Sequence, residues 1–322
     1  MNLLTGSTVL ITGGAGSFGS AFVRFCLESS ASKVIVFSRD EAKHEALRSE
    51  LNDSRLRFFI GDVRDRDRLT LAFHGVDYVI HAAALKVVPA GEYDPEEFIK
   101  TNIGGAQNVI HAAIQAGVKR VVALSTDKAC APANLYGSTK LCAEKLFVAA
   151  NSYSGGRGPR FSVTRYGNVA GSRGSVIPLW QRLADEGKPA VVTHPDMTRF
   201  HMTMDEAVEL VSTALTRMQG GEVFVPKLPT YKVTDLACAI SLIPFSVGTV
   251  RPGEKLAESL IGPDEARSTM DYGSHYRILP LHPWFDQDNN GTPVPDGFTY
   301  TSDSLDWRLT VEDLRRELNG VA

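Results

Sequence analysis

Two pairs of residues near the middle of the chain have the types and the spacing for acid–base chemistry. Tyr136 and Lys140 are one helical turn apart, so a helix would present them on the same face. A neighbouring ammonium favours the phenolate of a tyrosine, which could then remove a hydroxyl proton while hydride leaves the same carbon. Asp127 and Lys128 shortly precede this pair and add the acid and the amine needed to remove water from a neighbouring carbon. The four residues together predict oxidation, elimination and reduction at one site.

Along the chain, apolar runs alternate with segments of helical periodicity. This alternation predicts the fold that positions these residues. Continuous apolar runs are typical of strands buried on both faces of a parallel sheet. The expected strands are Thr8–Thr12, Lys33–Phe37, Leu56–Ile60, Tyr78–His81, Val121–Leu124, Phe161–Arg165 and Val223–Val225. We predict helices between them, including Pro95–Ala116 and Tyr136–Ala150. The alternation indicates an α/β, doubly wound parallel sheet of the Rossmann type.

The regular alternation fades after about residue 165, which predicts a second lobe. Segments rich in glycine, proline and polar residues suit the loops of a smaller lobe that covers a ligand. We therefore expect a dinucleotide-binding domain over residues 1–165, to which about 197–226 return. Residues 166–196 and 227–322 would form a discontinuous C-terminal substrate lobe.

Composition excludes several classes of function. The chain has 322 residues, of which 43% are hydrophobic and 22% charged, as in ordinary globular proteins. A net charge of −3 gives no reason to expect a nucleic-acid partner or a membrane surface. No apolar run approaches the roughly 18 residues of a membrane span. Four cysteines without a CxxC pair favour reduced thiols and a cytoplasmic location.

A glycine-rich turn follows the first expected strand. Gly13, Gly16 and Gly19 surround Ser17 and Phe18 between a strand and a helix. Glycines allow a tight turn and close backbone approach, and the helix N-terminus offers free N–H groups to a pyrophosphate. The turn therefore predicts dinucleotide binding, although a turn required only for packing would look the same.

The end of the second expected strand favours NADP over NAD. Ser38 and Arg39 stand where an acidic residue would accept hydrogen bonds from both ribose hydroxyls of NAD, and Lys43 follows one turn later. These side chains suit a 2′-phosphate. Asp40 keeps NAD as the alternative, and Arg39 with Lys43 could also be a solvated helix start. Asp62 could accept from the adenine amino group or could be the N-cap of a helix over Arg64–Phe73.

With these motifs, the chain resembles the extended short-chain dehydrogenase/reductase superfamily and, within it, the inverting UDP-N-acetylglucosamine 4,6-dehydratases of nucleotide-sugar biosynthesis. The triplet Thr126-Asp127-Lys128 beside an intact Tyr-x-x-x-Lys is specific to that subgroup. The matching stretches are the glycine turn, Ser38–Glu41, His81–Lys86, Lys100–Asn102, Ser125–Lys128, Asn134–Lys140, Arg165–Val169, Thr198–Phe200 and Arg251–Lys255. Cys130, Ala133 and Ala257 depart from the pattern and affect the fit of the substrate.

The resemblance implies a three-step cycle on UDP-N-acetylglucosamine. Tyr136 deprotonates the sugar 4-hydroxyl as hydride moves from C4 to NADP, and Thr126 hydrogen-bonds the 4-oxygen. The 4-ketone acidifies the C5 proton, which neutral Lys128 removes while protonated Asp127 donates to the leaving 6-hydroxyl. Hydride then returns to C6 and reprotonation inverts C5. NADP is therefore recycled, and we expect it to stay tightly bound.

The expected contacts divide into two groups along the chain. Cofactor contacts are expected from Gly13, Gly16, Ser17, Phe18, Gly19, Ser38, Arg39, Lys43, Asp62, Val63, Ala82, Ala83, Lys86, Asn102, Tyr136 and Lys140. Contacts with the nucleotide sugar are expected from Lys86, Asn168, Arg173, Val176, Thr193, Arg199, Arg251 and Glu254. The histidines show no ligand spacing, so we expect no metal site.

Two rival functions remain open from the sequence. A nucleotide-sugar epimerase would bind substrate through Asp127 and Lys128 without eliminating water, and a 5,6-dehydratase would omit the final reduction. A cofactor-binding regulator without turnover would have no use for the base Tyr136. We also expect a homo-oligomer, at least a dimer, paired through the helices Pro95–Ala116 and Tyr136–Ala150.

Overall fold

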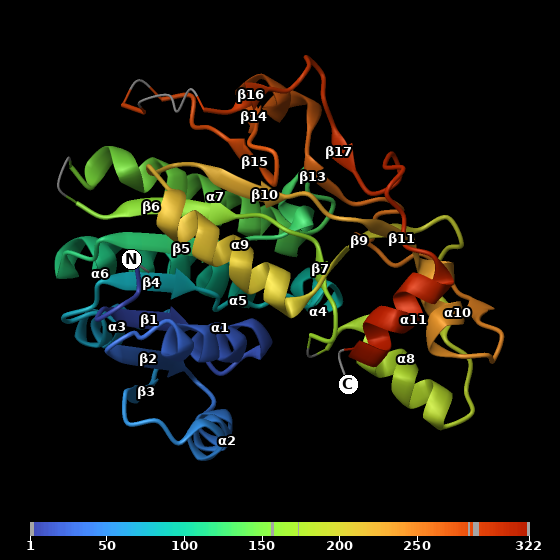
Figure 1. Cartoon of the computed structure of the whole chain (residues 1–322), viewed down its shortest axis with the longest axis horizontal. Coiled ribbons are helices and arrows are strands. Elements are labelled where there is room, and N and C mark those ends of the chain that lie inside the picture. Colours follow the sequence, from blue (N-terminus) through green and yellow to red (C-terminus); the bar gives the residue numbers. More distant parts are fainter. Residues whose placement is uncertain (1–2, 156–157, 173, 283, 286–289, 321–322) are drawn as a thin grey trace.

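One large sheet organises the chain, and its middle consists of the apolar runs in the sequence. The computed structural model describes residues 3–155, 158–172, 174–282, 284–285 and 290–320. The parallel part of the sheet contains, in spatial order, β3 (Leu56–Ile60), β2 (Lys33–Ser38), β1 (Thr8–Thr12), β4 (Tyr78–His81), β5 (Arg120–Leu124), β6 (Arg160–Thr164) and β10 (Val223–Pro226). The strand order reverses beside β1, so the predicted doubly wound sheet is confirmed (Figure 1).

The sheet continues beyond β10 with antiparallel strands that the sequence analysis did not assign to it. These are β15 (His275–Ile278), β14 (Thr269–Asp271) and β16 (Thr292–Pro293). All three lie within residues 227–322, which we expected to belong to the second lobe. Part of that segment therefore extends the main sheet, because its short strands pair with the edge that β10 would otherwise leave open.

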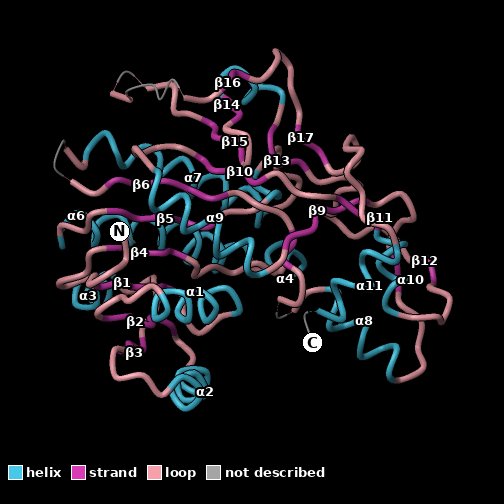
Figure 2. The backbone as a smooth tube through the Cα atoms, in the orientation of Figure 1, coloured by secondary structure: helices cyan, strands magenta, loops and turns pink. Residues whose placement is uncertain are grey.

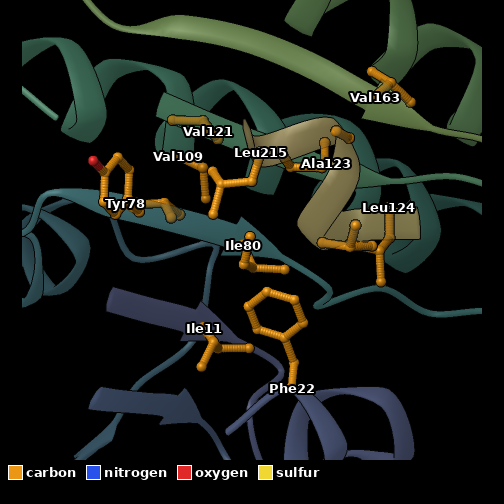
Figure 3. Packing of buried hydrophobic residues seen from close by; sticks show 14 of the residues in the cluster. Ile11, Phe22, Tyr78, Ile80, Val109, Val121, Ala123, Leu124, Val163 and Leu215 are labelled. Atoms are coloured by element: carbon orange, nitrogen blue, oxygen red, sulfur yellow. The ribbon is translucent and has the colours of Figure 1, made fainter. Parts of the chain in front are cut away.

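Helices cover both faces of the sheet. One face carries α1 (Ser17–Glu28) and α9 (Met204–Arg217), and the other carries α3 (Arg66–Ala72), α6 (Gly105–Ala116) and α7 (Leu135–Tyr153), while α2 (Glu41–Leu51) lies beside β2 and β3 (Figure 1). Phe22 of α1 lies over Ile11 of β1 and Ile80 of β4, and all three are completely buried (Figure 3). Burial of large apolar side chains on both faces holds the ends of the strands, and the loops after them, in fixed positions.

The segment predicted as a single helix over Pro95–Ala116 is helical throughout but changes pitch. It contains α5 (Pro95–Phe98), the π-helix η1 (Ile99–Gly104) and α6, and α4 (Val88–Tyr93) precedes it. A π-helical turn within an α-helix is frequent at functional sites. Here it carries the buried residues Thr101 and Asn102, and Asn102 bonds to Leu85 in the loop after β4 and to Thr139 of α7.

The remaining segments form the smaller lobe, which has its own apolar cluster around Trp180, Tyr231 and Leu236. Its helices are α8 (Val176–Asp185), α10 (Val233–Ile240) and α11 (Val311–Gly320), which lie beside the carboxyl ends of the parallel strands (Figure 2). The remaining strands are β7 (Asn168–Val169), β8 (Val191–Val192), β9 (Thr198–Met202), β11 (Thr230–Lys232), β12 (Ser246–Val247), β13 (Ser259–Ile261) and β17 (Tyr300–Thr301), with the short helices η2 (Asp127–Ala129) and η3 (Pro263–Ser268) nearby. Buried residues of β9, β13 and β17 belong to the main core. Among the described residues, no helix combines the length and apolar character needed to cross a bilayer.

Candidate active site

A cavity of about 1070 Å³ runs along the carboxyl ends of the parallel strands and continues under the smaller lobe. Its lining includes residues from the glycine turn, the β2 end, the 82–88 loop, η2, the start of α7 and the 251–254 loop. This is where doubly wound folds bind ligands. Within the described part of the chain, no group of three or more His, Cys, Asp and Glu residues could hold a metal ion.

The glycine turn has the shape that a dinucleotide requires. Gly13, Gly16, Ser17, Phe18 and Gly19 all line the cavity. A Cβ on Gly19 would lie 2.3 Å from the carbonyl oxygen of Gly13, so no larger residue fits this packing of helix against turn. The first helical residue is Ser17, behind the N-cap Gly16, and the first residues of α1 line the cavity, so the N-terminus of this helix lies at the cavity wall. The residues present therefore fit the pyrophosphate of a dinucleotide cofactor.

The end of β2 places the residues expected near the adenine ribose along the same cavity. Ser38, Arg39 and Lys43 line it, and the Arg39 side chain is more than half exposed. The Asp40 carboxylate accepts the backbone N–H of Lys43 as the N-cap of α2 and forms an ion pair with the Lys43 ammonium. The hydrogen bond from the Lys43 ammonium, and then the one from its backbone N–H, lower the pKa of Asp40. Asp40 is thus already bound within the protein, and the Arg39 guanidinium, which also lines the cavity, lies 3.5 Å from the Asp62 carboxylate.

Asp62 and Val63 also line the cavity, but Asp62 does not cap a helix. Its carboxylate accepts the backbone N–H of Arg64 at 3.0 Å and pairs with the Arg64 guanidinium at 2.7 Å. The N-cap of α3 is Asp65, whose side chain accepts the backbone N–H of Arg68. The alternative assignment of Asp62 as a helix cap is therefore wrong, because the helix begins later than the sequence pattern suggested.

Asn102 is not among the residues that line the cavity. Its amide nitrogen donates to the carbonyl oxygen of Leu85 at 2.9 Å and to Thr139 Oγ1 at 3.0 Å, and its oxygen accepts the backbone N–H of Leu85. Ala82, Ala83 and Lys86, by contrast, do line it. Asn102 therefore ties the 82–86 loop to α7, and the structure gives it a supporting position behind the expected cofactor contacts.

Tyr136 and Lys140 lie on the cavity side of α7. The helix starts at Leu135 behind the N-cap Asn134, and Gly137 permits its close approach to η2, since a Cβ there would lie 2.1 Å from the Lys128 carbonyl oxygen. Burial raises the pKa of Tyr136 to about 12, against the lowering effects of the Lys128 charge and a hydrogen bond with Thr126. Burial lowers the pKa of Lys140 to about 8, partly offset by Glu144.

Lys140 is held in place by β5, because its ammonium donates to the Leu124 carbonyl oxygen at 2.6 Å. Lys140 and the phenol of Tyr136 thus lie in the same cavity. We expected a neighbouring ammonium to lower the pKa of Tyr136; the charge that does so here is that of Lys128, and burial outweighs it.

Asp127 and Lys128 meet at the start of η2, as predicted, and both line the cavity. Asp127 is 1% exposed, and its Oδ1 accepts from Thr126 Oγ1 and from Lys128 Nζ, each at 3.0 Å. Lys128 Nζ also lies 3.0 Å from Glu258 Oε1. Burial lowers the pKa of Lys128, but the charges of Asp127 and Glu258 outweigh it and leave that pKa well above its ordinary value. The lysine is therefore not a solvated surface residue, since its side chain is 22% exposed.

The opposite end of the cavity contains most of the residues expected to bind a nucleotide sugar. Asn168, Val176, Thr193, Arg251 and Glu254 all line it. Arg173 lies outside the described residues. The Arg251 backbone N–H donates to Glu254 Oε2 at 3.2 Å, which closes the loop and leaves the Arg251 guanidinium exposed at the rim. Lys86 stands between the two halves, and burial lowers its pKa.

The contacts of Arg199 differ from those of an arginine whose guanidinium is free to bind a phosphate. Its side chain is about one-tenth exposed, and the guanidinium donates to the carbonyl oxygens of Thr198, Lys255 and Leu256 at 2.7 to 3.1 Å. Its Nε lies 4.0 Å from Glu258 Oε1. Arg199 therefore joins β9 to the 255–258 segment and is a fixed cation beside Glu258, although it also lines the cavity.

Sequence reasoning missed several lining residues, of which Glu258 is the most important. The others include Ser125, Asn134, Tyr166 and Tyr231. Glu258 stands in a loop before a three-residue strand, where no period or motif marks it. The only signal was an acidic residue soon after the Arg251–Lys255 stretch that we had already selected.

The comparisons with known proteins give relatives whose names describe enzymes that act on nucleotide sugars. The model of the polysaccharide biosynthesis protein family matches residues 9–280. A UDP-N-acetylglucosamine 4,6-dehydratase (inverting) of Campylobacter jejuni is 49% identical over 92% of this chain and 92% of its own length. A UDP-glucose 4-epimerase of Rickettsia prowazekii is 44% identical over 84% of this chain and 82% of its own.

Solved structures agree with the fold. Pen from Bacillus thuringiensis superposes with a TM-score of 0.93 over 99% of both chains at 36% identity. The dTDP-glucose 4,6-dehydratase DesIV from Streptomyces venezuelae, solved with NAD bound, gives a TM-score of 0.72 at 27% identity over 81% of this chain and 90% of its own. With a family match over most of its length and relatives well above 40% identity, the chain belongs to the polysaccharide biosynthesis protein family.

Proposed function

We propose that this protein is a hydro-lyase that dehydrates UDP-N-acetylglucosamine at C5 and C6, inverting C5 and giving a UDP-2-acetamido-2,6-dideoxy-4-keto-hexose. The observation that carries the proposal is the buried pair of Asp127 and Lys128 in the same cavity as Tyr136 and Lys140. The 49% identity to an inverting dehydratase of the same specificity supports it.

A nicotinamide cofactor belongs to this proposal, and we favour NADP. The bound nicotinamide would supply the hydride acceptor and, later, the hydride donor. Arg39 and Lys43 at the β2 end are cations suited to a 2′-phosphate, while the Asp40 carboxylate is engaged by Lys43. The NAD in the related DesIV structure keeps NAD as the alternative. Titration of the purified protein with each cofactor would separate the two.

We assign each proton transfer to a different side chain of the protein according to its position. Tyr136 takes the proton of the 4-hydroxyl, and the Thr126 side chain, whose hydroxyl donates to Asp127 Oδ1, stays near the 4-oxygen. Lys128 removes the C5 proton and Asp127 protonates the leaving 6-hydroxyl. Asp127 Oδ2 is buried and, among the described residues, has no hydrogen-bond partner, so this oxygen is available to a leaving group. Elimination thus uses groups that a simple dehydrogenase would not need.

The nucleotide end of the substrate would lie toward the smaller lobe. We assign the diphosphate to Arg251, with its exposed guanidinium, and the uridine ribose to Glu254. Asn168 would contact the sugar or a phosphate, while Val176 and Thr193 would frame the base. Arg199 would act there mainly through the loop that it fixes.

Incubation with UDP-N-acetylglucosamine followed by mass spectrometry tests the reaction. Loss of one water with a reduced C6 methyl group in the NMR spectrum, and deuterium at C5 in heavy water, would support the inverting dehydratase. The epimerase relatives make the alternative concrete: an unchanged mass with an altered C4 configuration would identify an epimerase. Water loss without a methyl signal would identify a 5,6-dehydratase.

Oligomeric state and location complete the proposal. Large apolar side chains stay exposed at Tyr93 of α4, Ile99 of η1 and Tyr153 of α7, on or beside the helices expected to pair with a second copy. We therefore propose at least a homodimer, which light scattering at working concentration would test. Its four free cysteines support the expectation of a cytoplasmic protein, and fractionation of cells that express it would test that expectation.

A further inference from the structure

Glu258 has a position that the proposed roles of the other residues leave unexplained. It is 2% exposed and directly precedes β13. Its backbone N–H donates to Ser302 Oγ at 3.0 Å, and its carbonyl oxygen accepts the backbone N–H of Ser302 at 2.9 Å. Ser302 is completely buried and also bonds to Thr198 of β9. Ser302 therefore holds both the N–H and the carbonyl oxygen of Glu258 and is itself held by β9.

The Glu258 side chain reaches from this anchor to the amine of Lys128. Its Oε1 lies 3.0 Å from Lys128 Nζ and 4.0 Å from Arg199 Nε. Its Oε2 is buried and, within the described residues, has no hydrogen-bond partner. A buried carboxylate is stable only when it is paired, and here its closest cation is the proposed C5 base.

The two carboxylates together define the direction of the Lys128 amine. Besides its bond to Cε, a lysine nitrogen has three tetrahedral positions, each of which holds a proton or, in the neutral amine, the lone pair. The hydrogen bond to Asp127 Oδ1 and the ion pair with Glu258 Oε1, each with an N–O distance of 3.0 Å, would engage two of them. The third position is left for the lone pair that must meet the C5 proton. With Asp127 alone, the amine could rotate about a single hydrogen bond and lose that direction.

We propose that Glu258 is a positioning residue for the elimination step, which holds the Lys128 amine with its lone pair toward C5 of the substrate. The inference rests on the proposed dehydratase function and deepens it. Arg199 is the cation that keeps the charge of Glu258 compensated when Lys128 is neutral, since its contacts with three backbone carbonyls hold it in place.

Protons and electrons balance without a further reactant. A proton moves from Lys128 Nζ to Asp127 along their hydrogen bond, which gives a neutral amine and a carboxylic acid. The amine then turns about its Cε–Nζ bond, so that its two remaining N–H groups face Asp127 and Glu258 and its lone pair takes the third position. The C5–H bond then breaks, its proton goes to Lys128 and its electron pair forms the C5=C6 bond. The C6–O bond breaks, and the hydroxyl leaves as water with the proton of Asp127. Glu258 stays in contact with the Lys128 nitrogen and never carries the transferred proton.

The charged and titratable groups that face this amine come from several elements. Tyr136 of α7 and Tyr231 of β11 lie close enough for the Lys128 charge to lower their pKa values, although burial raises both to about 12. The others are Asp127 of η2, Glu258 before β13 and Arg199 of β9. Glu258 is the group that combines direct contact with Lys128 and an anchor outside η2.

Two variants of Glu258 separate positioning from general stability. Glu258→Ala removes the acceptor, whereas Glu258→Gln keeps an amide oxygen at the same reach. The matched control is Glu222→Ala, which removes another buried glutamate, bound to Ser162 and to backbone N–H groups but outside the cavity. Melting temperature and bound cofactor are measured first, so that only folded protein is compared.

Rapid mixing of cofactor-loaded protein with UDP-N-acetylglucosamine resolves the steps. A rise in the near-ultraviolet absorbance of reduced nicotinamide reports C4 oxidation, and its decay reports hydride return after elimination. We expect Glu258→Ala to keep the rise within about threefold of wild type and to slow the decay about 100-fold, at the lower end of acid–base contributions. Glu258→Gln should recover at least about tenfold of that loss. The control should slow both phases equally or neither.

The outcomes distinguish this inference from the proposed function. A decay in Glu258→Ala close to wild type, an equal slowing of both phases, or a glutamine variant no faster than alanine would overturn the positioning role while the dehydratase stands. Wild-type protein that reduces its cofactor without ever releasing water from the sugar would instead overturn the proposed function itself.

Discussion

Replacing Lys128 by methionine gives the sharpest single test of the acid–base pair. Methionine keeps much of the side-chain volume but removes the amine that contacts both Asp127 and Glu258. We expect water loss to fall by about 10²- to 10⁴-fold, the usual contribution of a positioned base. Oxidation at C4 depends on Tyr136 and Lys140, so the reduced cofactor and the 4-keto sugar should accumulate on the protein.

The same change also has a stability effect whose size follows from the structure. The Lys128 side chain is 22% exposed, and its loss leaves two buried carboxylates without their shared cation. Breaking a buried ion pair of this kind reduces the free energy of unfolding by about 3–5 kcal/mol when the partners stay charged. Uptake of a proton by Glu258 relieves part of that loss.

The sign of the pH dependence follows from Glu258. Burial, and then the Asp127 charge, raise its pKa in the folded protein, and loss of Lys128 removes a lowering influence. Between the unfolded value near ~4.3 and the raised folded value, the folded state keeps a proton that the unfolded state has lost. The free energy of unfolding of Lys128→Met should therefore fall as pH rises through this window.

Denaturant unfolding at about pH 5 and pH 8 measures the stability part, and stopped-flow absorbance with mass spectrometry measures the chemistry. Lys145→Met, which removes a lysine outside the cavity on the same helix as Tyr136, is the control. Undiminished water loss in Lys128→Met would refute the role of Lys128 as the C5 base. An equal destabilisation at both pH values would refute the electrostatic argument.

Three further predictions concern the cofactor half. Arg39→Glu should weaken NADP binding by about 10- to 100-fold and leave NAD binding within a few fold. The reason is that one charge-assisted contact with the 2′-phosphate is replaced by repulsion. Calorimetry with both cofactors measures the two affinities. Gly19→Ala should abolish tight cofactor binding, since its Cβ would lie 2.3 Å from the Gly13 carbonyl oxygen, and full retention of cofactor through gel filtration would contradict this. Burial lowers the pKa of His81 to about 3, so stability should fall by up to about 1.4 kcal/mol per pH unit below its unfolded value near ~6.5. His81→Asn, which can still reach Thr12, should flatten that slope in denaturant titrations, and an unchanged slope would exclude His81 as its cause.

The features that sequence reasoning identified are those encoded locally. The glycine turn sits between an apolar strand and an amphipathic helix, and Tyr136 and Lys140 share one helix face whatever surrounds them. The strand order follows from the alternation of elements and the right-handed crossover rule. The parallel sheet and the meeting of Asp127 with Tyr136 at its carboxyl edge were therefore predictable.

The features that escaped depend on long-range contacts. Asn102 and Arg199 belong to stretches that match the family, but neighbouring backbone carbonyls, invisible in the sequence, occupy their side chains. Glu258 meets Lys128 only because β13 pairs with β17 and Ser302 fixes the backbone between them. Strands of two or three residues carry too little pattern to reveal such pairing.

The dependence of Glu258 on Ser302 has a consequence for the growing chain. Ribosomes add about 5–20 residues per second and N-terminal units generally fold first, so the glycine turn and the helix of Tyr136 emerge well before Ser302. A nascent chain can thus form its nucleotide-binding pocket while the Lys128 amine still lacks its contact with Glu258. Competence for water removal would arrive last, with the final segment released from the ribosome.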